Sequence, residues 1–179
     1  MNKPLFSLLA GSLLMTAPTW GAEGDWDRAR AAHERGDYAE EVAIIRPLAE
    51  KGYPFAQFNM GVLYDEGKGV PLDDAQAIQW YRKAAEQGVP QAQVNLGIMY
   101  EQGEGVPPDA VRAYFWYALA ESQGDGQAPR AKQDIAKKMT PTQIEEAERQ
   151  VKEFKAKHTF PIPPLPPAPD SGAAHGGNG

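Results

Sequence analysis

The chain has 179 residues, a net charge of −6 and no cysteine. This length allows one domain of ordinary size with a buried core. The negative charge argues against a nucleic-acid partner, because non-specific binding needs Lys and Arg side chains to neutralise phosphates. The lack of cysteine excludes disulfides, a thiolate zinc site and a cysteine nucleophile.

Residues 1–22 have the features of a secretory signal peptide. Lys3 gives a basic start, and the apolar run from Leu5 to Ala17 is too short to span a bilayer. Small residues then precede a cleavage site after Gly21 or Ala22. We expect export to the periplasm or the medium, by a Gram-negative bacterium, with no membrane span after cleavage. A retained membrane anchor is the alternative.

Residues 23–52 predict two short helices, over about 26–35 and 38–51. Gly36 and Asp37 form the tight turn between them. Pro47 should bend the second helix or shift its start, because proline lacks an N–H and clashes with the preceding turn.

Residues 53–88 and 89–124 are one 36-residue unit written twice, and they align without a gap. A fixed period of this size indicates a solenoid of stacked helical pairs. Residues 23–52 are a degenerate copy that lacks the Gly-x-Gly-Val-Pro loop of the full units. The positions shared by the two full units include Ala56/Ala92, Gln57/Gln93, Asn59/Asn95, Gly61/Gly97, Tyr64/Tyr100, Gly67/Gly103, Gly69/Gly105, Asp73/Asp109, Ala77/Ala113, Trp80/Trp116 and Tyr81/Tyr117.

Each full unit predicts two helices, over about 54–66 and 73–87 in the first. Asp73 should cap the second helix by accepting from free backbone N–H groups. Gly61 stands in the middle of the first helix, where glycine costs about 1 kcal/mol relative to alanine. Its repetition as Gly97 indicates a place where two helices cross closely. Trp80 supplies large apolar area for packing between helices.

This unit carries a fixed pattern of small, aromatic and glycine positions, which resembles the Sel1-like repeat, a relative of the tetratricopeptide repeat. The second unit departs from the pattern at Glu121, which stands where the first has Ala85. The resemblance implies an all-α fold: an α-α solenoid of antiparallel helix pairs, with two full repeats, a degenerate first pair and a C-terminal capping pair. The residues that carry it are Ala56, Met60, Gly61, Tyr64, Gly67, Gly69, Val70, Asp73, Ala77, Trp80, Tyr81, Ala84, Ala85 and Gly88.

Residues 125–158 resemble the helical pair that often closes such arrays. The first helix, over about 127–138, should turn Ala131 and Ile135 inward. Thr140 and Gln143 match a capping box, with Pro141 at the first helical position between them. The next helix then carries one apolar stripe, formed by Ile144, Ala147, Val151 and Phe154.

Residues 159–179 form a Pro- and Gly-rich end. Six of the ten residues from Phe160 to Pro169 are proline, a composition that favours polyproline II and cannot form a core. We expect a stiff, disordered tail. The alternative is a Pro-x-x-Pro ligand for an aromatic groove.

The sequence contains no recognisable motif for catalysis or metal binding, so we expect no catalytic residue, no cofactor and no metal. The histidines, His33, His158 and His175, lack metal-ligand spacing. His33 occupies the place of Tyr64, which favours a packing role. Neither serine of the mature chain, Ser122 or Ser171, lies in a Gly-x-Ser-x-Gly elbow.

The interpretation that remains is a non-catalytic protein–protein interaction module, an adaptor or regulator that acts as a monomer. In related arrays the first helix of each pair lines a concave face that binds a peptide or protein segment, and small exported members serve as immunity proteins against secreted effectors. The alternatives are that Phe55 and Phe58 pack onto the degenerate first unit, or that Asp65, Glu66 and Glu101 make a cell-envelope hydrolase. The residues expected on the concave face are Phe55, Phe58, Val62, Asp65, Glu66, Gln91, Val94, Ile98, Glu101 and Gln102.

Charge is unevenly distributed along the chain. Residues 23–126 hold 18 acidic and 9 basic side chains, a net charge of −9, whereas residues 127–158 hold 5 and 8, a net charge of +3. Such polarity is able to steer a partner. The alternative, which we favour, is a solvated cap.

Overall fold

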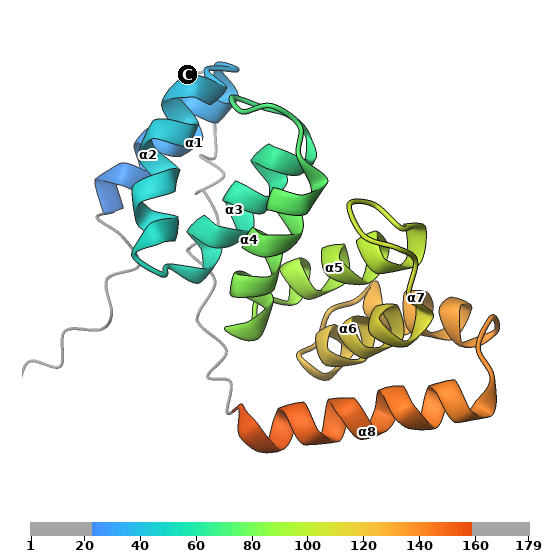
Figure 1. Ribbon diagram of the computed structural model, residues 1–179. Helices are drawn as coiled ribbons and strands as arrows, with labels where there is room; N and C mark the ends of the chain where they lie inside the picture. Colours follow the sequence, from blue (N-terminus) through green and yellow to red (C-terminus); the bar gives the residue numbers. More distant parts are fainter. Residues whose placement is uncertain (1–22, 159–179) are drawn as a thin grey trace, which may run out of the picture.

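The computed structural model describes residues 23–158, so the expectations for residues 1–22 and 159–179 lie outside the described residues. Within the described range the chain forms eight helices and no strand (Figure 1). The helices are α1 (Glu23–Glu34), α2 (Tyr38–Glu50), α3 (Pro54–Asp65), α4 (Asp74–Glu86), α5 (Pro90–Gln102), α6 (Ala110–Ser122), α7 (Ala128–Ala136) and α8 (Pro141–Lys157).

Consecutive helices pair and the pairs stack. The helices α1 and α2, α3 and α4, and α5 and α6 contact each other within pairs. The second helix of each pair then packs against the first helix of the next, as α2 does on α3 and α4 on α5. The expected all-α solenoid is therefore confirmed.

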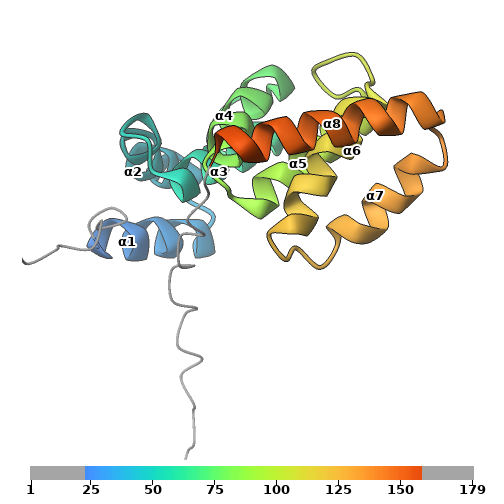
Figure 2. The same cartoon turned by 90° about the horizontal axis from the view of Figure 1, so that it is seen from below.

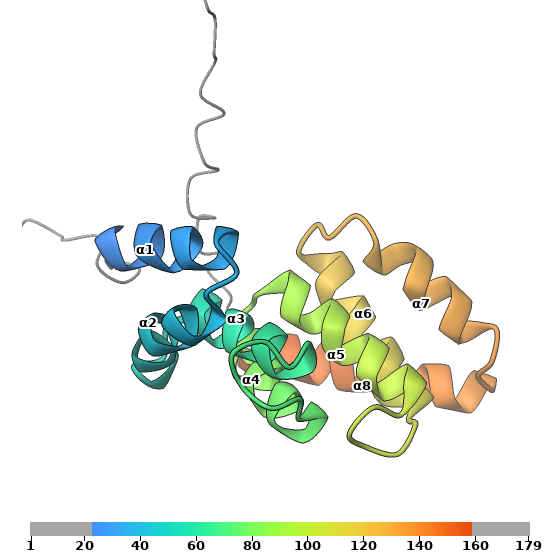
Figure 3. The same ribbon diagram turned by 90° about the horizontal axis from the view of Figure 1, so that it is seen from above.

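The closing helices are arranged differently from the regular pairs. Both α7 and α8 pack mainly against α6, and at most weakly against each other. Figures 2 and 3 show the two helices diverging from the loop that joins them. On α7, Ile135 is buried and Ala131 is half-buried. On α8, Ala147 is buried and the rest of the expected stripe packs against the same core.

The expected helix caps are present. Asp73 accepts a hydrogen bond from the backbone N–H of Gln76, and Asp109 does so from Arg112. The Thr140 and Gln143 capping box forms as expected. Pro47 lies inside α2, which still begins at Tyr38, so the proline does not shift the helix start.

Two glycines explain how closely the helices of a full unit approach. A Cβ atom on Gly61 would overlap the ring of Tyr81, and one on Gly97 would overlap the ring of Tyr117. The close crossing expected at these positions is confirmed. It lies between the first helix and an aromatic side chain of the second.

The Gly-x-Gly loop of each full unit rests on the unit before it. Gly69 has φ +68° and lies against the backbone of Tyr38, at the start of α2. Gly105, with φ +64°, lies in the same way against Asp74 at the start of α4, where a Cβ would come within 2.7 Å of its side chain. Glycine is required at both places by the positive φ and by the close backbone approach.

The buried apolar residues form two clusters. The first cluster joins α1, α2 and α3 and includes Trp80 of α4. The second extends from α4 to α8 and includes Tyr81 and Trp116. Trp80 is 8% exposed and Trp116 is 6% exposed, so both fill the core as expected.

Candidate interaction surface

The residues expected to bind a partner lie on α3 and α5, and most keep some exposure. We call them the inner-face residues. Glu66, Gln91 and Gln102 are exposed, whereas six others are half-buried: Phe55, Phe58, Val62, Asp65, Ile98 and Glu101. Val94 is the exception: it is 9% exposed and belongs to the second core cluster. Its short β-branched side chain is covered by its core neighbours, so it offers little surface to a partner.

The aromatic residues of α3 pack toward the second core cluster. Phe55 and Phe58 contact that cluster, which contains residues of α4 and α5. The ring of Phe58 lies on that of Tyr81, with 5.9 Å between centroids. The alternative that these side chains pack onto the degenerate first unit is therefore not the arrangement found.

The inner-face carboxylates accept hydrogen bonds from buried tyrosines. The hydroxyl of Tyr81 donates to Asp65 over 3.0 Å, and that of Tyr117 donates to Glu101 over 3.1 Å. The Nζ of Lys138 also donates to Glu101, over 2.8 Å. These carboxylates therefore join the first helix of a unit to the second, and Glu101 also contacts the cap.

Burial shapes the titration of these pairs. Burial raises the pKa of Asp65 above its ordinary value, while the hydrogen bond from Tyr81 opposes that rise. Burial, and then the charge of the facing carboxylate, raises the pKa values of both Tyr81 and Tyr117. Both hydroxyls therefore stay protonated and keep donating at neutral pH.

The acidic edge extends beyond the residues expected from the sequence. Glu104, in the loop of the second full unit, has its pKa raised by burial and by the charges of Asp65 and Asp74. Asp74 and Glu66 raise the pKa of Asp65 in the same way. These four acidic residues therefore share one negative region at the end of α3, of which only Glu66 is paired with a cation of the described residues, Lys68, over 2.7 Å.

Sequence reasoning missed a series of polar contacts between units. The Nε2 of Gln57 donates to the carbonyl of Ala49, and Gln93 donates to Ala85 in the same way one unit later. Each of these glutamines also accepts from a glutamine at the end of the next helix, Gln87 or Gln123. The signal was present, because both glutamine pairs recur at the 36-residue period.

A second contact between units joins arginine to tyrosine. Arg46 donates to the hydroxyl of Tyr64 over 3.2 Å, and Arg82 donates to that of Tyr100 over 2.7 Å. The two arginines are again 36 residues apart. These contacts join α2 to α3 and α4 to α5, so their role is structural.

Other candidate chemistry is sparse in the described part of the chain. His33 is exposed, lies 2.9 Å from a carboxylate oxygen of Glu41 and meets the ring of Tyr38 edge-on. No group of three or more His, Asp or Glu side chains among residues 23–158 is placed to hold a metal ion. None of the helices in this range combines the length and apolar character needed to cross a membrane.

Comparisons with known proteins agree with this architecture. A family model for the Sel1 repeat matches residues 54–89 and 90–125. A solved Sel1 repeat protein from Oxalobacter formigenes is 33% identical, with a TM-score of 0.51, and the match covers 62% of this chain and 98% of that one. No curated protein matches the sequence significantly.

A second solved structure is a protective antigen of uropathogenic Escherichia coli strains, which displays an SLR fold. It is 35% identical with a TM-score of 0.69, and the match covers 74% of this chain. The chain spans only 30% of the length of that protein. Its likeness therefore concerns the repeat array.

Proposed function

Because the chain belongs to the Sel1 repeat family, we propose that it is an exported, non-catalytic module that binds a peptide or protein segment on its inner-face residues. Sel1 repeat proteins typically mediate protein–protein interaction, and the family is generally a scaffold without catalysis. The signal-peptide features of residues 1–22 support export to the bacterial periplasm or the medium.

The observation that carries this proposal is the apolar strip along α3 and α5. Phe58, Val62 and Ile98 pack against the second core cluster and yet remain only half-buried. Acidic and amide side chains border them, among them the exposed Glu66 and Gln102. An apolar centre with a polar edge is the usual anatomy of a protein interface.

The charge at this edge suggests the chemistry of the partner. Burial and the charges of nearby carboxylates raise the pKa values of Asp65 and Glu104, and those nearby carboxylates include Asp74. A Lys or Arg side chain of a partner would neutralise this region and gain Coulomb energy. The segment bound here therefore combines apolar side chains with at least one basic residue.

Within this proposal the protein acts as an adaptor or regulator in the cell envelope. A narrower version is an immunity protein that holds a secreted effector. This version is supported by the small size of the array and by the signal-like N-terminus, and capture of an effector encoded nearby would establish it.

The test is affinity capture from envelope extract with the folded chain as bait, followed by mass spectrometry. Ile98→Glu places a charge in the apolar strip, and Glu66→Lys reverses the charge at its exposed edge. Each should reduce capture of the specific partner by about tenfold or more, which corresponds to about 1.4 kcal/mol. Gln79→Glu, at an exposed position of α4, is the matched control.

Melting temperatures are measured for every variant, because Ile98 packs against the core. Glu66 is exposed and its ion pair with Lys68 lies at the surface, so Glu66→Lys still tests the site if Ile98→Glu unfolds. Equal capture by the parent, Glu66→Lys and Gln79→Glu would contradict a site on the inner face.

A further inference from the structure

A cavity of about 390 Å³ lies where α6, α7 and α8 meet, away from the inner-face residues. This volume falls within the range of about 300–1,000 Å³ that is usual for ligand pockets. Its lining residues are Tyr114, Ala118, Glu121 and Ser122 of α6, Lys132 of α7, and Glu148, Val151, Lys152 and Lys155 of α8. We call this space the cap cavity.

The packing of the closing helices creates the cap cavity. The helices α7 and α8 each pack on α6 and diverge from each other (Figures 2 and 3). Side chains of all three helices line the space between them. Tyr114 is 6% exposed, and Ala118 and Val151 are half-buried. These three side chains supply an apolar floor.

The carboxylates of the cap cavity already have partners. The hydroxyl of Tyr114 donates to Glu148 over 3.2 Å. Glu121 forms an ion pair with Lys132, whose ammonium group also lies 5.9 Å from the centre of the Tyr114 ring. Glu121 is therefore paired with a cation, whereas Glu148 accepts from an uncharged hydroxyl, which leaves its negative charge uncompensated.

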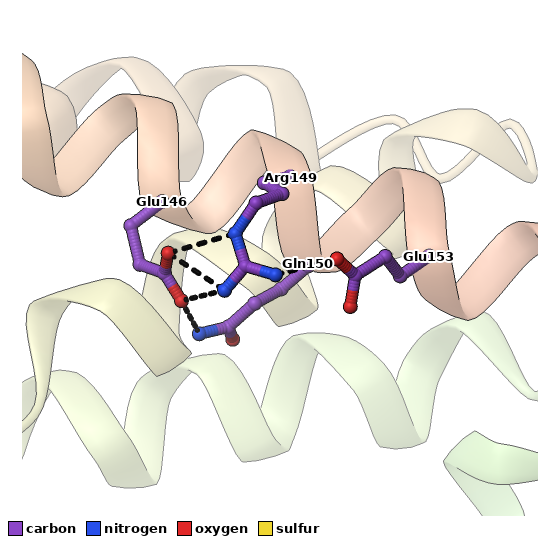
Figure 4. A network of polar contacts seen from close by, with 4 residues as sticks. All are labelled: Glu146, Arg149, Gln150 and Glu153. Atoms are coloured by element: carbon purple, nitrogen blue, oxygen red, sulfur yellow. Dashed lines mark hydrogen bonds and ion pairs between the residues drawn. The ribbon is translucent and has the colours of Figure 1, made fainter.

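Two lysines of α8 form no ion pair within the described residues. Lys152 and Lys155 line the cavity, and neither takes part in an ion pair with another residue of the range 23–158. The neighbouring basic residue Arg149 is engaged by Glu146 and Glu153 on the same helix (Figure 4). The positive charge available at the cavity is thus that of Lys152 and Lys155, offset in part by Glu148, so the lining as a whole carries a net charge of +1.

We propose that the cap cavity binds an acidic peptide segment. Its carboxylates pair with Lys152 and Lys155, and an adjacent apolar side chain rests on Tyr114, Ala118 and Val151. The charge distribution favours this occupant, because residues 127–158 carry +3 whereas residues 23–126 carry −9. An acidic segment is repelled along most of the array and attracted to its capped end.

The test is a titration of the ¹⁵N-labelled folded chain, followed by amide chemical shifts. The probe is a blocked hexapeptide, Asp-Leu-Glu-Asp-Leu-Glu, and its amide counterpart Asn-Leu-Gln-Asn-Leu-Gln is the control peptide. The acidic peptide should shift the amides of Ala118, Val151 and Lys152. The dissociation constant should rise with ionic strength, since salt screens the exposed lysines.

Matched variants locate the binding on the cavity. The double variant Lys152→Glu/Lys155→Glu should weaken the acidic peptide by about tenfold or more. Lys157→Glu removes an equally exposed positive charge from the end of the same helix, outside the cavity, and should change the dissociation constant less than about twofold.

Several results would overturn the proposal: no shift with the acidic peptide, equal shifts with the amide peptide, or equal weakening by Lys157→Glu. Binding to anionic phospholipid vesicles, with no response to the peptide, would instead identify a membrane surface as the occupant. The cap cavity shares no lining residue with the inner face, so failure of either proposal does not entail failure of the other.

Discussion

At the scale of single residues, the identities shared by the two full units mark structural positions. Gly61 and Gly97 were singled out because a glycine inside a helix is costly. The structure shows that each makes room for a tyrosine ring of the partner helix. Tyr81 is fully buried and its hydroxyl is held by Asp65, so the ring cannot move aside.

Replacement of Gly61 with alanine should therefore destabilise the fold although alanine is the better helix former. Overlap of the new methyl group with the Tyr81 ring should lower the free energy of unfolding by about 1–3 kcal/mol. Urea denaturation measures this change. Gly24→Ala is the control, because nothing lies within 4 Å of a Cβ at that position of α1. A Gly61→Ala variant as stable as the parent would show that the crossing tolerates a side chain.

The carboxylates show where reasoning from single residues fails. Asp65 and Glu101 occupy equivalent positions near the ends of their helices, and the sequence predicts both on the concave face, available to a partner. In the structure both accept from a buried tyrosine hydroxyl. A side chain of intermediate length reaches either solvent or a neighbouring helix, and only the packing decides which.

At the scale of helices, local chemistry was predictable and long-range packing was not. The caps at Asp73, Asp109 and Thr140 depend on residues within three positions of one another, so the sequence suffices to identify them. The apolar stripe of α8 was also evident. A stripe does not specify its partner, however, and α8 packs on α6 instead of completing a regular pair with α7.

The capping box of α8 provides a test of how strongly this helix depends on its first turn. Thr140→Ala removes the side chain that accepts from the backbone N–H of Gln143, and should cost about 1 kcal/mol. Amide exchange in α8 should rise more than in α3. Thr142→Ala, at an exposed position in the same turn, is the control. Equal effects of the two substitutions would show that the cap contributes nothing specific.

At the scale of the whole molecule, the two core clusters meet at α4. Its neighbouring residues Trp80 and Tyr81 point into different clusters, Trp80 into the first and Tyr81 into the second. The helix α4 thus packs against both clusters and connects the two halves of the array. The period of the sequence predicted the stack. It did not predict this division or the cap cavity, since both depend on how helices distant in sequence fit together.

Trp80→Ala should destabilise the whole molecule and not its first half alone. Loss of this buried ring should lower the free energy of unfolding by about 3–5 kcal/mol. The fluorescence of the remaining tryptophans, which include Trp26 on the first cluster and Trp116 in the second, and far-UV circular dichroism should report the same lowered transition. Lys83→Ala, which removes an exposed side chain whose ammonium group stands 4.0 Å from the centre of the Trp80 ring, should have a much smaller effect. Two separated transitions would show that α4 does not couple the clusters.

The glycine loops that rest on the preceding unit give the array a direction. The loop at Gly69 packs on the start of α2, and the loop at Gly105 packs on the start of α4. Every full unit therefore supplies the loop that contacts the second helix of the unit before it. A duplicated 36-residue unit inserted after residue 124 would contain its own glycine loop, and this loop could pack on the start of α6 in the same way. Gene duplication is thereby able to lengthen such a protein one unit at a time, without redesign of the existing joints.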